Sequence, residues 1–248
     1  MLSLVVITNN EEDRLSACLA SVPFADEIWV MDSGSTDDTV QVARRAGAHV
    51  VQTDWPGHVA QKNRVLALAT QPWVLSLDAD ERLSAAAGAS LVGAMAAPGD
   101  AIGFRFPRLS SWLGMPIRHG RWYPDRKLRV VRRGEGTWMG DDPHDQLVCS
   151  GPTTLLEGDL LHEPYRDLAE HFSTIDRYTA ISARTLYARG RRAHLWDVGL
   201  RGPLHFVDAY LLRRGFLDGG AGLAVAGLGA VYSSLKWSRL WRLQRGLE

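Results

Sequence analysis

Two aspartates at the end of an apolar segment are the residues of this sequence best suited to chemistry. Residues 73–77 (WVLSL) are typical of a buried strand. Asp78 and Asp80 follow, and in an extended chain a spacing of two places both carboxylates on the same face. Hard oxygen ligands of this kind suit Mg²⁺ or Mn²⁺. A simpler interpretation is also open, in which the pair ends the strand and caps a helix that begins near Ser84.

Further acids follow two other predicted strands. Asp32 follows the strand predicted at 27–31, and Asp54 follows the one predicted at 49–52. In an open parallel sheet, ligands bind just beyond the carboxyl ends of the strands. Carboxylates gathered at one rim repel each other unless a metal, a sugar hydroxyl or a base edge relieves the repulsion. The sequence therefore predicts a ligand site at this rim.

Strand and helix patterns alternate over the first hundred residues. Strands are expected at 4–7, 27–31, 49–52 and 73–77, and helices at 11–20, between Ser35 or Thr36 and Gly47, and at 61–69. Repeated β-α units of this length predict an α/β fold with a mostly parallel sheet that helices cover on both faces.

The composition restricts the class of protein. Basic and acidic residues number 28 each, so the net charge gives no support for nucleic acid as the main partner. Cys18 and Cys149 are expected to be reduced thiols of a cytosolic protein. No run of 18 uninterrupted apolar residues is present, so a spanning helix is not expected. The glycine-rich motifs of dinucleotide-binding proteins and P-loop ATPases are also missing, which disfavours both classes.

Short motifs in a fixed order resemble the family 2 glycosyltransferases with the GT-A fold. They are TNNEE at 8–12, MDSGSTD at 31–37 and LDAD at 77–80. The segment QTDWPG at 52–57, followed by QKN at 61–63, is similar to bacterial glucosyltransferases that extend the inner core of lipopolysaccharide. The resemblance covers nearly the whole chain and implies a GT-A sheet flanked by helices, with a C-terminal helical extension.

The resemblance implies a pocket for a nucleotide sugar. Asp32 would hydrogen-bond the uracil or the ribose, with Thr8 and Glu11 lining the same pocket. Asp54 would contact the base or the ribose. For Asp32 the alternative is an acid that serves only an Asx turn.

The resemblance also implies a metal site next to the diphosphate. Asp80 would coordinate Mg²⁺ or Mn²⁺, Asp78 would contact the ribose or a metal-bound water, and Lys62 would contact the diphosphate. The metal would neutralise the charge that develops on departing UDP. His162 follows an apolar segment and is either a further metal ligand or a structural histidine. A zinc site is not expected.

The base of an inverting transfer must lie on the face opposite the leaving diphosphate. Related enzymes place an acid pair or a histidine–acid pair where this chain has His144 and Asp145, and Asp145 is therefore assigned as the base. Asp141 and Asp142 are rivals, and a solvated acidic turn is the alternative.

Aromatic residues between 101 and 165 are candidates for stacking against the acceptor sugar. They are Trp112, Trp122, Tyr123 and Trp138. Aromatic residues in such a region more often form local core.

The C-terminal third is expected to be helical, beginning with an amphipathic helix at 168–189. Near the end, Trp237, Leu240 and Trp241 share one helical face, and basic residues occupy the other. That pattern predicts a helix lying in an anionic membrane surface. The alternatives are a tail that packs on the catalytic domain and a dimer contact.

These expectations combine into one hypothesis. Residues 1–100 would bind the nucleotide sugar, 101–188 would bind the acceptor, and 189–248 would form a membrane-associating tail. The enzyme would be a metal-dependent, inverting hexosyltransferase, cytoplasmic and peripheral on the inner membrane, that moves glucose from UDP-glucose to a lipid-linked saccharide. The alternatives are a transferase that makes a polyprenyl-phosphate sugar, a non-catalytic nucleotide-sugar-binding protein, and a phosphotransferase with an aspartyl nucleophile.

Overall fold

The computed structural model describes residues 1–140 and 145–247. Its chain forms two compact units. The first, here called the catalytic unit, comprises Met1–Arg108 and Asp125–His162, and the second, the helical unit, comprises Leu109–Pro124 and Glu163–Glu248. These boundaries differ from the three functional segments expected from the sequence, whose roles stay predictions.

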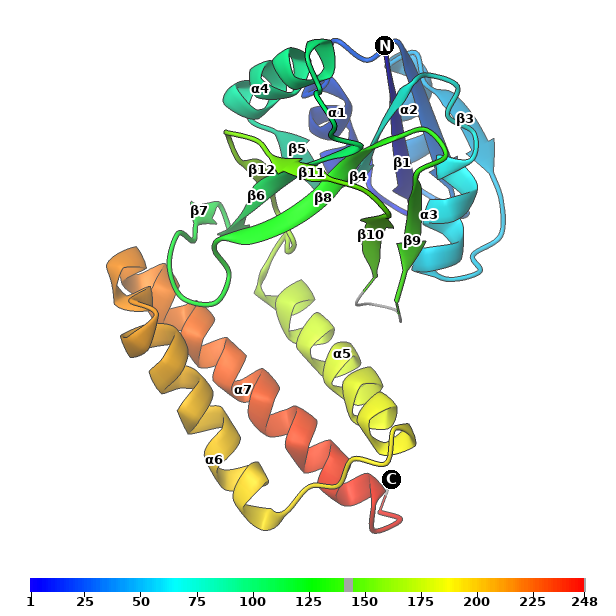
Figure 1. The fold of residues 1–248 in the computed structure, drawn as a ribbon. Coiled ribbons are helices and arrows are strands. Elements are labelled where there is room, and N and C mark those ends of the chain that lie inside the picture. Colours follow the sequence, from blue (N-terminus) through cyan, green and yellow to red (C-terminus); the bar gives the residue numbers. More distant parts are fainter. Residues whose placement is uncertain (141–144, 248) are drawn as a thin grey trace. The chain divides into compact units, whose positions relative to one another are not determined.

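The catalytic unit is built around one large mixed sheet (Figure 1). The strands, some of which extend into the helical unit, are β1 (Leu2–Thr8), β2 (Glu27–Asp32), β3 (His49–Gln52), β4 (Trp73–Asp78), β5 (Glu81–Leu83), β6 (Gly103–Trp112), β7 (Met115–Pro116), β8 (Asp125–Arg132), β9 (Gly136–Met139), β10 (Gln146–Cys149), β11 (Thr153–Leu155) and β12 (Leu160–His162). The main order is β3-β2-β1-β4-β8-β6-β12-β5, and β9 and β10 form a separate hairpin. The first four strands in this order are parallel, as the repeated β-α pattern predicted, whereas β8 runs antiparallel to β4 and β6.

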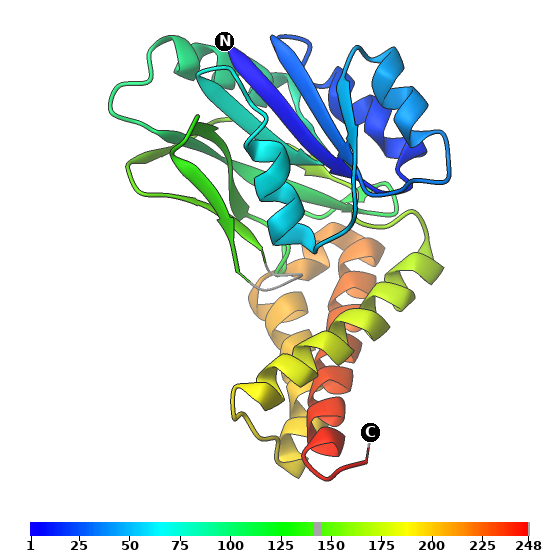
Figure 2. The ribbon, with the colours of Figure 1, turned by 90° about the vertical axis from the view of Figure 1, so that its right-hand side faces the viewer.

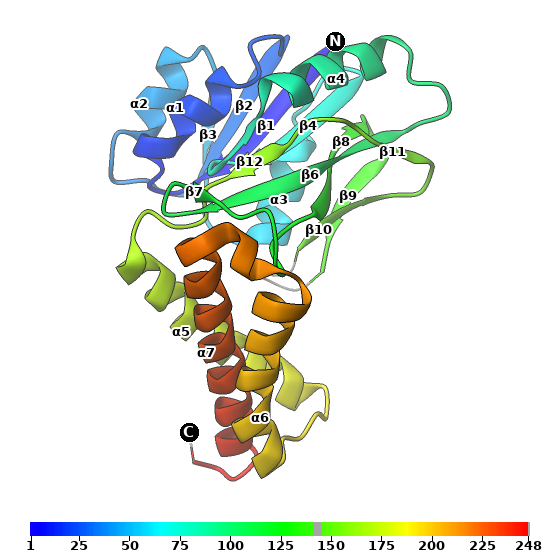
Figure 3. The same cartoon turned by 90° about the vertical axis from the view of Figure 1, so that its left-hand side faces the viewer.

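Helices cover both faces of this sheet. They are α1 (Glu12–Ala20), α2 (Thr39–Arg45), α3 (His58–Leu66) and α4 (Ala85–Ala96). Alternate residues of β1 point to opposite faces. Leu2 and Leu4 pack with α1, α2 and α4, whereas Val5 packs with α3. Figures 2 and 3 show these two opposite faces. All seven residues of β1 are buried, which identifies it as a central strand.

The register of the parallel strands brings their ends together at one rim. Thr8 pairs with Asp32, and Ile7 of the same strand pairs with Asp78. The predicted gathering of acids at the carboxyl ends is therefore present. The simpler interpretation of the Asp78/Asp80 pair is wrong in one respect: strand β5 separates the pair from α4, and the Ser84 hydroxyl caps that helix by accepting a hydrogen bond from Ala87 N.

The helical unit consists mainly of a long helix that packs against two others. Its elements are α5 (Leu168–Ala188), α6 (Leu195–Phe206), the π-helix η1 (Val207–Leu212), the 3₁₀ helix η2 (Gly215–Asp218) and α7 (Gly219–Leu243). Glycine permits the close approach of α6 to α7, since a Cβ on Gly202 would lie 2.1 Å from the Ser234 Oγ. The 29-residue stretch Gly215–Leu243 is long and apolar enough to cross a membrane by length and composition, although the sequence had argued against a spanning helix.

Candidate active site

Asp78 lies at the end of β4 between two cations. Its Oδ1 is 2.7 Å from the Lys62 Nζ, and its Oδ2 is 3.4 Å from the Arg129 Nη2. Burial by itself would raise the pKa of Asp78, but the charges of Lys62 and Arg129 outweigh it and hold this pKa well below its usual range. The carboxylate therefore stays ionised at any physiological pH.

Lys62 joins two of the acids that the sequence singled out. Its Nζ is 2.7 Å from Asp78 and also 2.7 Å from the Asp145 Oδ2, and it lies 4.2 Å from the centroid of the Trp138 ring. The residue is only 4% exposed. Burial would lower its pKa, but the nearby carboxylates, Asp78 first, raise it despite the opposing charge of Arg129. The contact predicted between Lys62 and a diphosphate stays a prediction, because here the ammonium pairs with protein carboxylates.

The two neighbours of Lys62 on α3 fix other parts of the site. The Gln61 Nε2 donates to the Ser33 Oγ at 2.8 Å, beyond the end of β2. The Asn63 side chain accepts from Trp138 N and donates to Trp138 O, both at 2.9 Å. Three consecutive residues thus hold the loop after β2, the end of β4 and strand β9 in place. The sequence gave Gln61 and Asn63 no individual role.

A buried ion network under this rim was not predicted. Arg129 contacts Glu81 through two bonds of 2.8 Å, and Glu81 is 1% exposed. Arg108 lies 3.4 Å from Glu81 and pairs with Asp125 at 2.7 Å. A planar guanidinium that binds both oxygens of a carboxylate fixes its orientation. One signal was visible in the sequence, since Arg129 interrupts the apolar run of β8.

The side chains of Asp80 and His162 lie next to each other. The Asp80 Oδ2 is 3.4 Å from the His162 Nε2, because β12 pairs with β5 directly after the aspartate. Burial would raise the pKa of Asp80, but His162 lowers it. The Asp80 Oδ1 is buried and has no hydrogen-bond partner among the described residues. A buried carboxylate oxygen without a donor is unfavourable unless a ligand occupies its open side.

These two residues fit a divalent ion that keeps other ligands. Within residues 1–140 and 145–247, no group of three or more His, Cys, Asp or Glu side chains is placed to hold a metal. Mg²⁺ and related ions often use only one or two carboxylates and take the remaining oxygens from water and phosphate. The Asp80–His162 pair therefore suits an ion shared with a bound diphosphate, and does not suit a metal caged by protein alone.

Asp32 and Thr8 lie together as predicted, but the carboxylate serves a turn. The Asp32 Oδ1 accepts from the backbone N–H groups of Gly34 and Ser35, and its Oδ2 accepts from the hydroxyls of Ser35 and Thr8. Asp32 is fully buried. This geometry is the Asx turn that was the alternative interpretation. The predicted contact of Asp32 with a nucleotide stays a prediction.

Two other predicted pocket residues form ion pairs of their own. Glu11 precedes α1 and binds Arg14 at 2.7 Å. The Asp54 side chain is 72% exposed and lies 2.8 Å from the Arg64 Nη1, whose hydrogen bond and charge lower the pKa of Asp54. The structure therefore joins neither residue to the Lys62–Asp78–Asp145 group.

The acceptor candidates separate into two groups. Trp138 is 2% exposed and lies against Lys62 and Arg129, so it is local core, the more common of the two interpretations. Trp112, Trp122 and Tyr123 belong to the helical unit. Asp141, Asp142 and His144 lie outside the described residues.

Comparison with known proteins identifies the family. Residues 3–148 match the family model described as glycosyl transferase family 2, so the protein belongs to that family. The fold class predicted from the sequence is confirmed: a mixed α/β sheet flanked by helices, with a long apolar helix near the C-terminus.

The chain is also similar to individual proteins. The chain is similar to the lipopolysaccharide core biosynthesis glycosyltransferase LpsC of Rhizobium meliloti (strain 1021), with 29% identity over 97% of this chain and 92% of that protein. It is also 26% identical to an uncharacterised glycosyltransferase of Rickettsia typhi, over 88% and 79% of the two chains. Among solved structures, glucosyl-3-phosphoglycerate synthase from Mycobacterium tuberculosis, in complex with Mn²⁺, UDP-glucose and phosphoglyceric acid, shares 28% identity over 43% of each chain. Its TM-score of 0.37 is too low to support a statement about this chain.

Proposed function

We propose that the protein is a divalent-metal-dependent, inverting hexosyltransferase that uses a nucleotide sugar, with UDP-glucose as the expected donor. Its acceptor would be a sugar of a lipid-linked oligosaccharide such as the lipopolysaccharide core. Family membership and the full-length similarity to LpsC support the class of reaction. The observation that carries the proposal is the buried Oδ1 of Asp80, which lies beside His162 and has no hydrogen-bond partner within residues 1–140 and 145–247.

Asp80 and His162 would hold the metal, either Mg²⁺ or Mn²⁺. When bound, the ion would neutralise the negative charge that accumulates on the departing diphosphate. Asp78 and Lys62 would keep this side of the site rigid, since they bind each other at 2.7 Å.

Asp145 would accept the proton of the attacking acceptor hydroxyl. Its Oδ2 is held by Lys62, and the residue is mostly buried, with a side chain that is 11% exposed. The lysine limits the rotation of the carboxylate. A base must be both unprotonated and positioned before the acceptor arrives. Direct attack on the sugar then needs no covalent enzyme intermediate.

Calorimetry of UDP binding tests the metal part of the proposal. With Mn²⁺ the intact chain is expected to bind UDP more tightly than in chelator. Asp80→Ala should remove this difference and abolish transfer while it leaves the circular dichroism spectrum unchanged. Equal binding of UDP with and without chelator by the intact chain would contradict the proposal. A panel of nucleotide sugars in a donor-hydrolysis assay identifies the donor.

A transferase that makes a polyprenyl-phosphate sugar is the second candidate. The long apolar stretch Gly215–Leu243 favours it as much as it favours a lipid-linked oligosaccharide, because both acceptors carry a lipid. The two candidates differ in chemistry, since a phosphate acceptor is already ionised and needs little help from a base.

The face of α7 expected to enter a membrane is covered in this structure. Trp237 is 9% exposed and Leu240 is fully buried, and both pack with Ala183 of α5 and Ala193. The sequence pattern was correct about an apolar face, but that face forms the core of the helical unit. Trp237 and Leu240 are therefore internal to the helical unit, and the membrane contact predicted for the tail at 189–248 stays a prediction.

Several of the exposed apolar residues of the helical unit lie on α6 and η1. Leu200, Leu204 and Leu211 are 53%, 61% and 53% exposed and recur at helical spacing. Exposed arginines flank them: Arg191 and Arg192 precede α6, and Arg213 and Arg214 follow η1. Apolar side chains between cationic ends fit an anionic lipid surface. We therefore place the proposed membrane contact here, and call this surface the α6–η1 face.

Vesicle co-sedimentation tests the α6–η1 face. The double change Leu200→Gln and Leu204→Gln should reduce binding to vesicles that contain phosphatidylglycerol. Val92→Gln, which alters an apolar residue of α4 that is 46% exposed, is the matched control. Equal loss in both variants, or no loss in the first, would contradict this assignment.

A further inference from the structure

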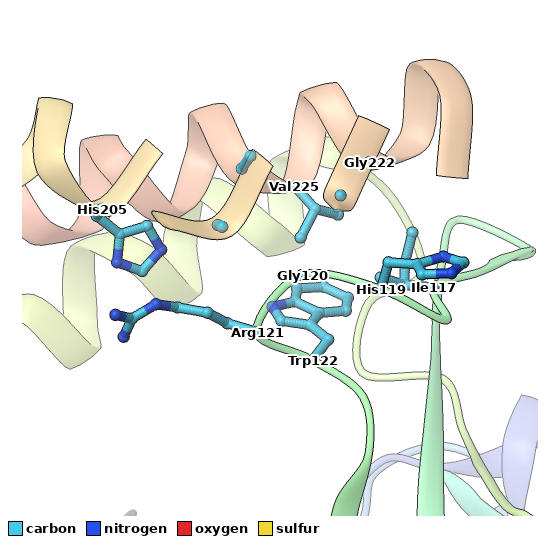
Figure 4. Close-up of a pocket in the computed structure, with 11 residues that line it drawn as sticks. Ile117, His119, Gly120, Arg121, Trp122, His205, Gly222 and Val225 are labelled. Carbon is cyan, nitrogen blue, oxygen red and sulfur yellow. The ribbon is translucent and has the colours of Figure 1, made fainter. Parts of the chain in front are cut away.

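The helical unit contains a cavity with aromatic walls. It has a volume of about 200 Å³, and α5, α7, the loop before β8 and His205 of α6 line it. Its aromatic residues are Trp122, Tyr165, His171, Tyr178 and Tyr232. A smaller pocket adjoins it and shares Arg121, Trp122, His205 and Val225 with it (Figure 4). Cavities with a few polar groups among aromatic walls are typical ligand sites.

Contacts within the helical unit hold these walls in place. The Tyr165 and His171 rings stack with their centroids 3.8 Å apart. The Trp112 Nε1 donates to the His171 Nδ1 at 3.2 Å, so this histidine is held as the neutral ring. On the opposite wall a Cβ on Gly229 would lie 2.4 Å from the His205 Nε2, so only glycine lets that ring lie against α7. The cavity is therefore preformed.

Positive charge accumulates beside this cavity. Arg121 and His205 line the cavity, and Figure 4 shows their side chains on the same side of the smaller pocket. Tyr232 lines the cavity, and the Lys236 Nζ lies 5.7 Å from the centroid of its ring. Burial, together with the charges of Arg201 and Arg121, lowers the pKa of Lys236. Burial and then Arg121 also lower the pKa of His205, although Asp208 opposes this.

The nearby carboxylates are already occupied. Asp208 accepts from Arg121 at 2.6 Å and from Arg213 at 3.0 Å. Asp197 accepts from Arg201 at 2.8 Å. Lys236 has no carboxylate partner in the part of the chain that the structure describes. A half-buried ammonium among other cations is unfavourable unless an anion joins it.

We infer that this cavity binds an anionic group, a phosphate or a carboxylate, that is carried on a sugar of the acceptor. The ring faces of Trp122, Tyr178 and Tyr232 would pack against the sugar, and Arg121 and Lys236 would supply the positive charge that faces the anion. The inference rests on the proposed function for the identity of the ligand as acceptor. A lipid phosphate would satisfy the same cations, and the experiment below separates the two sources.

Calorimetry with the full chain, saturated with UDP and Mn²⁺ to occupy the donor site, tests the inference. The probes are glucose 6-phosphate, glucuronate, glucose and dodecyl phosphate. Glucose 6-phosphate and glucuronate are expected to bind at least about tenfold more tightly than glucose, because a charge-assisted bond contributes about 1.5–3 kcal/mol. Binding of dodecyl phosphate without binding of either charged sugar would overturn the sugar assignment and identify a lipid phosphate as the anion.

Matched variants of α7 locate the binding. Lys236→Met is expected to weaken glucose 6-phosphate at least about tenfold, because it removes a charge-assisted bond. Arg239→Met, three residues further along the same helix, removes an arginine that pairs with Asp176 and should leave binding unchanged. Tyr178→Ala is the second variant of the cavity and should weaken the charged sugars as well. Equal binding by the intact chain and Lys236→Met would overturn the inference.

UDP binding separates this inference from the proposed function. If the intact chain binds the charged sugars and Lys236→Met does not, the anion site stands even when UDP fails to bind. If UDP binds with Mn²⁺ and no charged probe does, the anion site is wrong and the proposed transfer is unaffected. Circular dichroism checks that each variant is folded.

Discussion

Within the described residues, the catalytic unit and the helical unit differ in whether their buried charged side chains have partners of opposite charge. In the catalytic unit, Lys62 binds Asp78 and Asp145, and Arg129 donates to both carboxylate oxygens of Glu81. In the helical unit, Lys236 has cations and a tyrosine as neighbours. An ion pair fixes the positions of its two side chains, whereas a buried polar group without a partner indicates where a ligand would bind. Two groups without a hydrogen-bond or carboxylate partner among the described residues have opposite sign: the Asp80 Oδ1, which suits a cation, and the Lys236 ammonium, which suits an anion.

The two units also differ in how much of their apolar side chains is exposed. The sheet of the catalytic unit buries Leu2, Leu4 and Leu75 completely, and each such side chain stabilises the fold by about 1.5–3 kcal/mol. The α6–η1 face leaves leucines more than half exposed. Apolar surface of that extent is typical of a binding surface. The apolar side chains of the sheet are therefore internal, whereas those of the α6–η1 face are available for contact.

The largest expected effect is the loss of transfer on removal of the base. Asp145→Ala should lower the rate by about 10²–10⁴-fold, the usual contribution of a general base. UDP binding should persist, because the metal residues are untouched. The measurement is single-turnover transfer from UDP-glucose. Asp145→Asn discriminates between the acceptors: it should be nearly silent with a polyprenyl phosphate and severe with a sugar hydroxyl. Near-normal transfer by Asp145→Ala would remove this residue from the mechanism and turn attention to Asp141 and Asp142.

The next effect concerns the stability of the catalytic unit. Lys62→Met leaves two carboxylates close together with one cation fewer between them, and the loss of one partner from a buried ion pair typically costs about 3–5 kcal/mol. Arg64→Met on the same helix breaks only the exposed pair with Asp54 and should cost less than about 1 kcal/mol. Urea unfolding followed by circular dichroism measures both. If both variants lost a similar, small part of the free energy of unfolding, the buried ion pairs of Lys62 would not stabilise the acidic rim.

The smallest effect is a pH dependence confined to the helical unit. Burial lowers the pKa of His171 to about 4, whereas an unperturbed histidine titrates near 6.5. The unfolded chain therefore binds this proton first, and the helical unit should lose stability as pH falls from about 6.5 to about 4.

Thermal unfolding of the intact chain and His171→Gln across that range checks this pH dependence. The variant should show a shallower decline, because glutamine can accept the Trp112 hydrogen bond without titrating. Identical slopes would show that His171 is not the responsible group.

Local patterns in the sequence predicted a substantial part of this architecture. The strand ending at Asp78, the helix beginning at Leu168 and the alternation of strands and helices over the first hundred residues are all present. Each depends on the periodicity of apolar residues within one segment, which side-chain burial imposes directly. The boundaries were less exact: the helix expected at 61–69 spans His58–Leu66, so Lys62 lies within its first two turns.

The contacts within the site depend on residues far apart in the chain. Lys62 meets Asp145 across 83 positions, and Arg129 meets Glu81 across 48. No local pattern encodes such a pair, because the strand order and the register decide which side chains face each other. Gln61, Asn63 and Arg129 were missed for this reason. The Asx turn at Asp32 is local, and its DSGS sequence could have identified it.

The sequence by itself determined that the chain has a rim of acids after parallel strands and an apolar face near its C-terminus. Only the tertiary structure decided which acid oxygen stays without a partner and what covers each apolar face. The physical reason is that the period of the apolar residues shows which face of a helix or strand is removed from water. It does not specify which other surface covers that face. For Trp237 and Leu240 that surface is protein, whereas Leu200 and Leu204 stay more than half exposed.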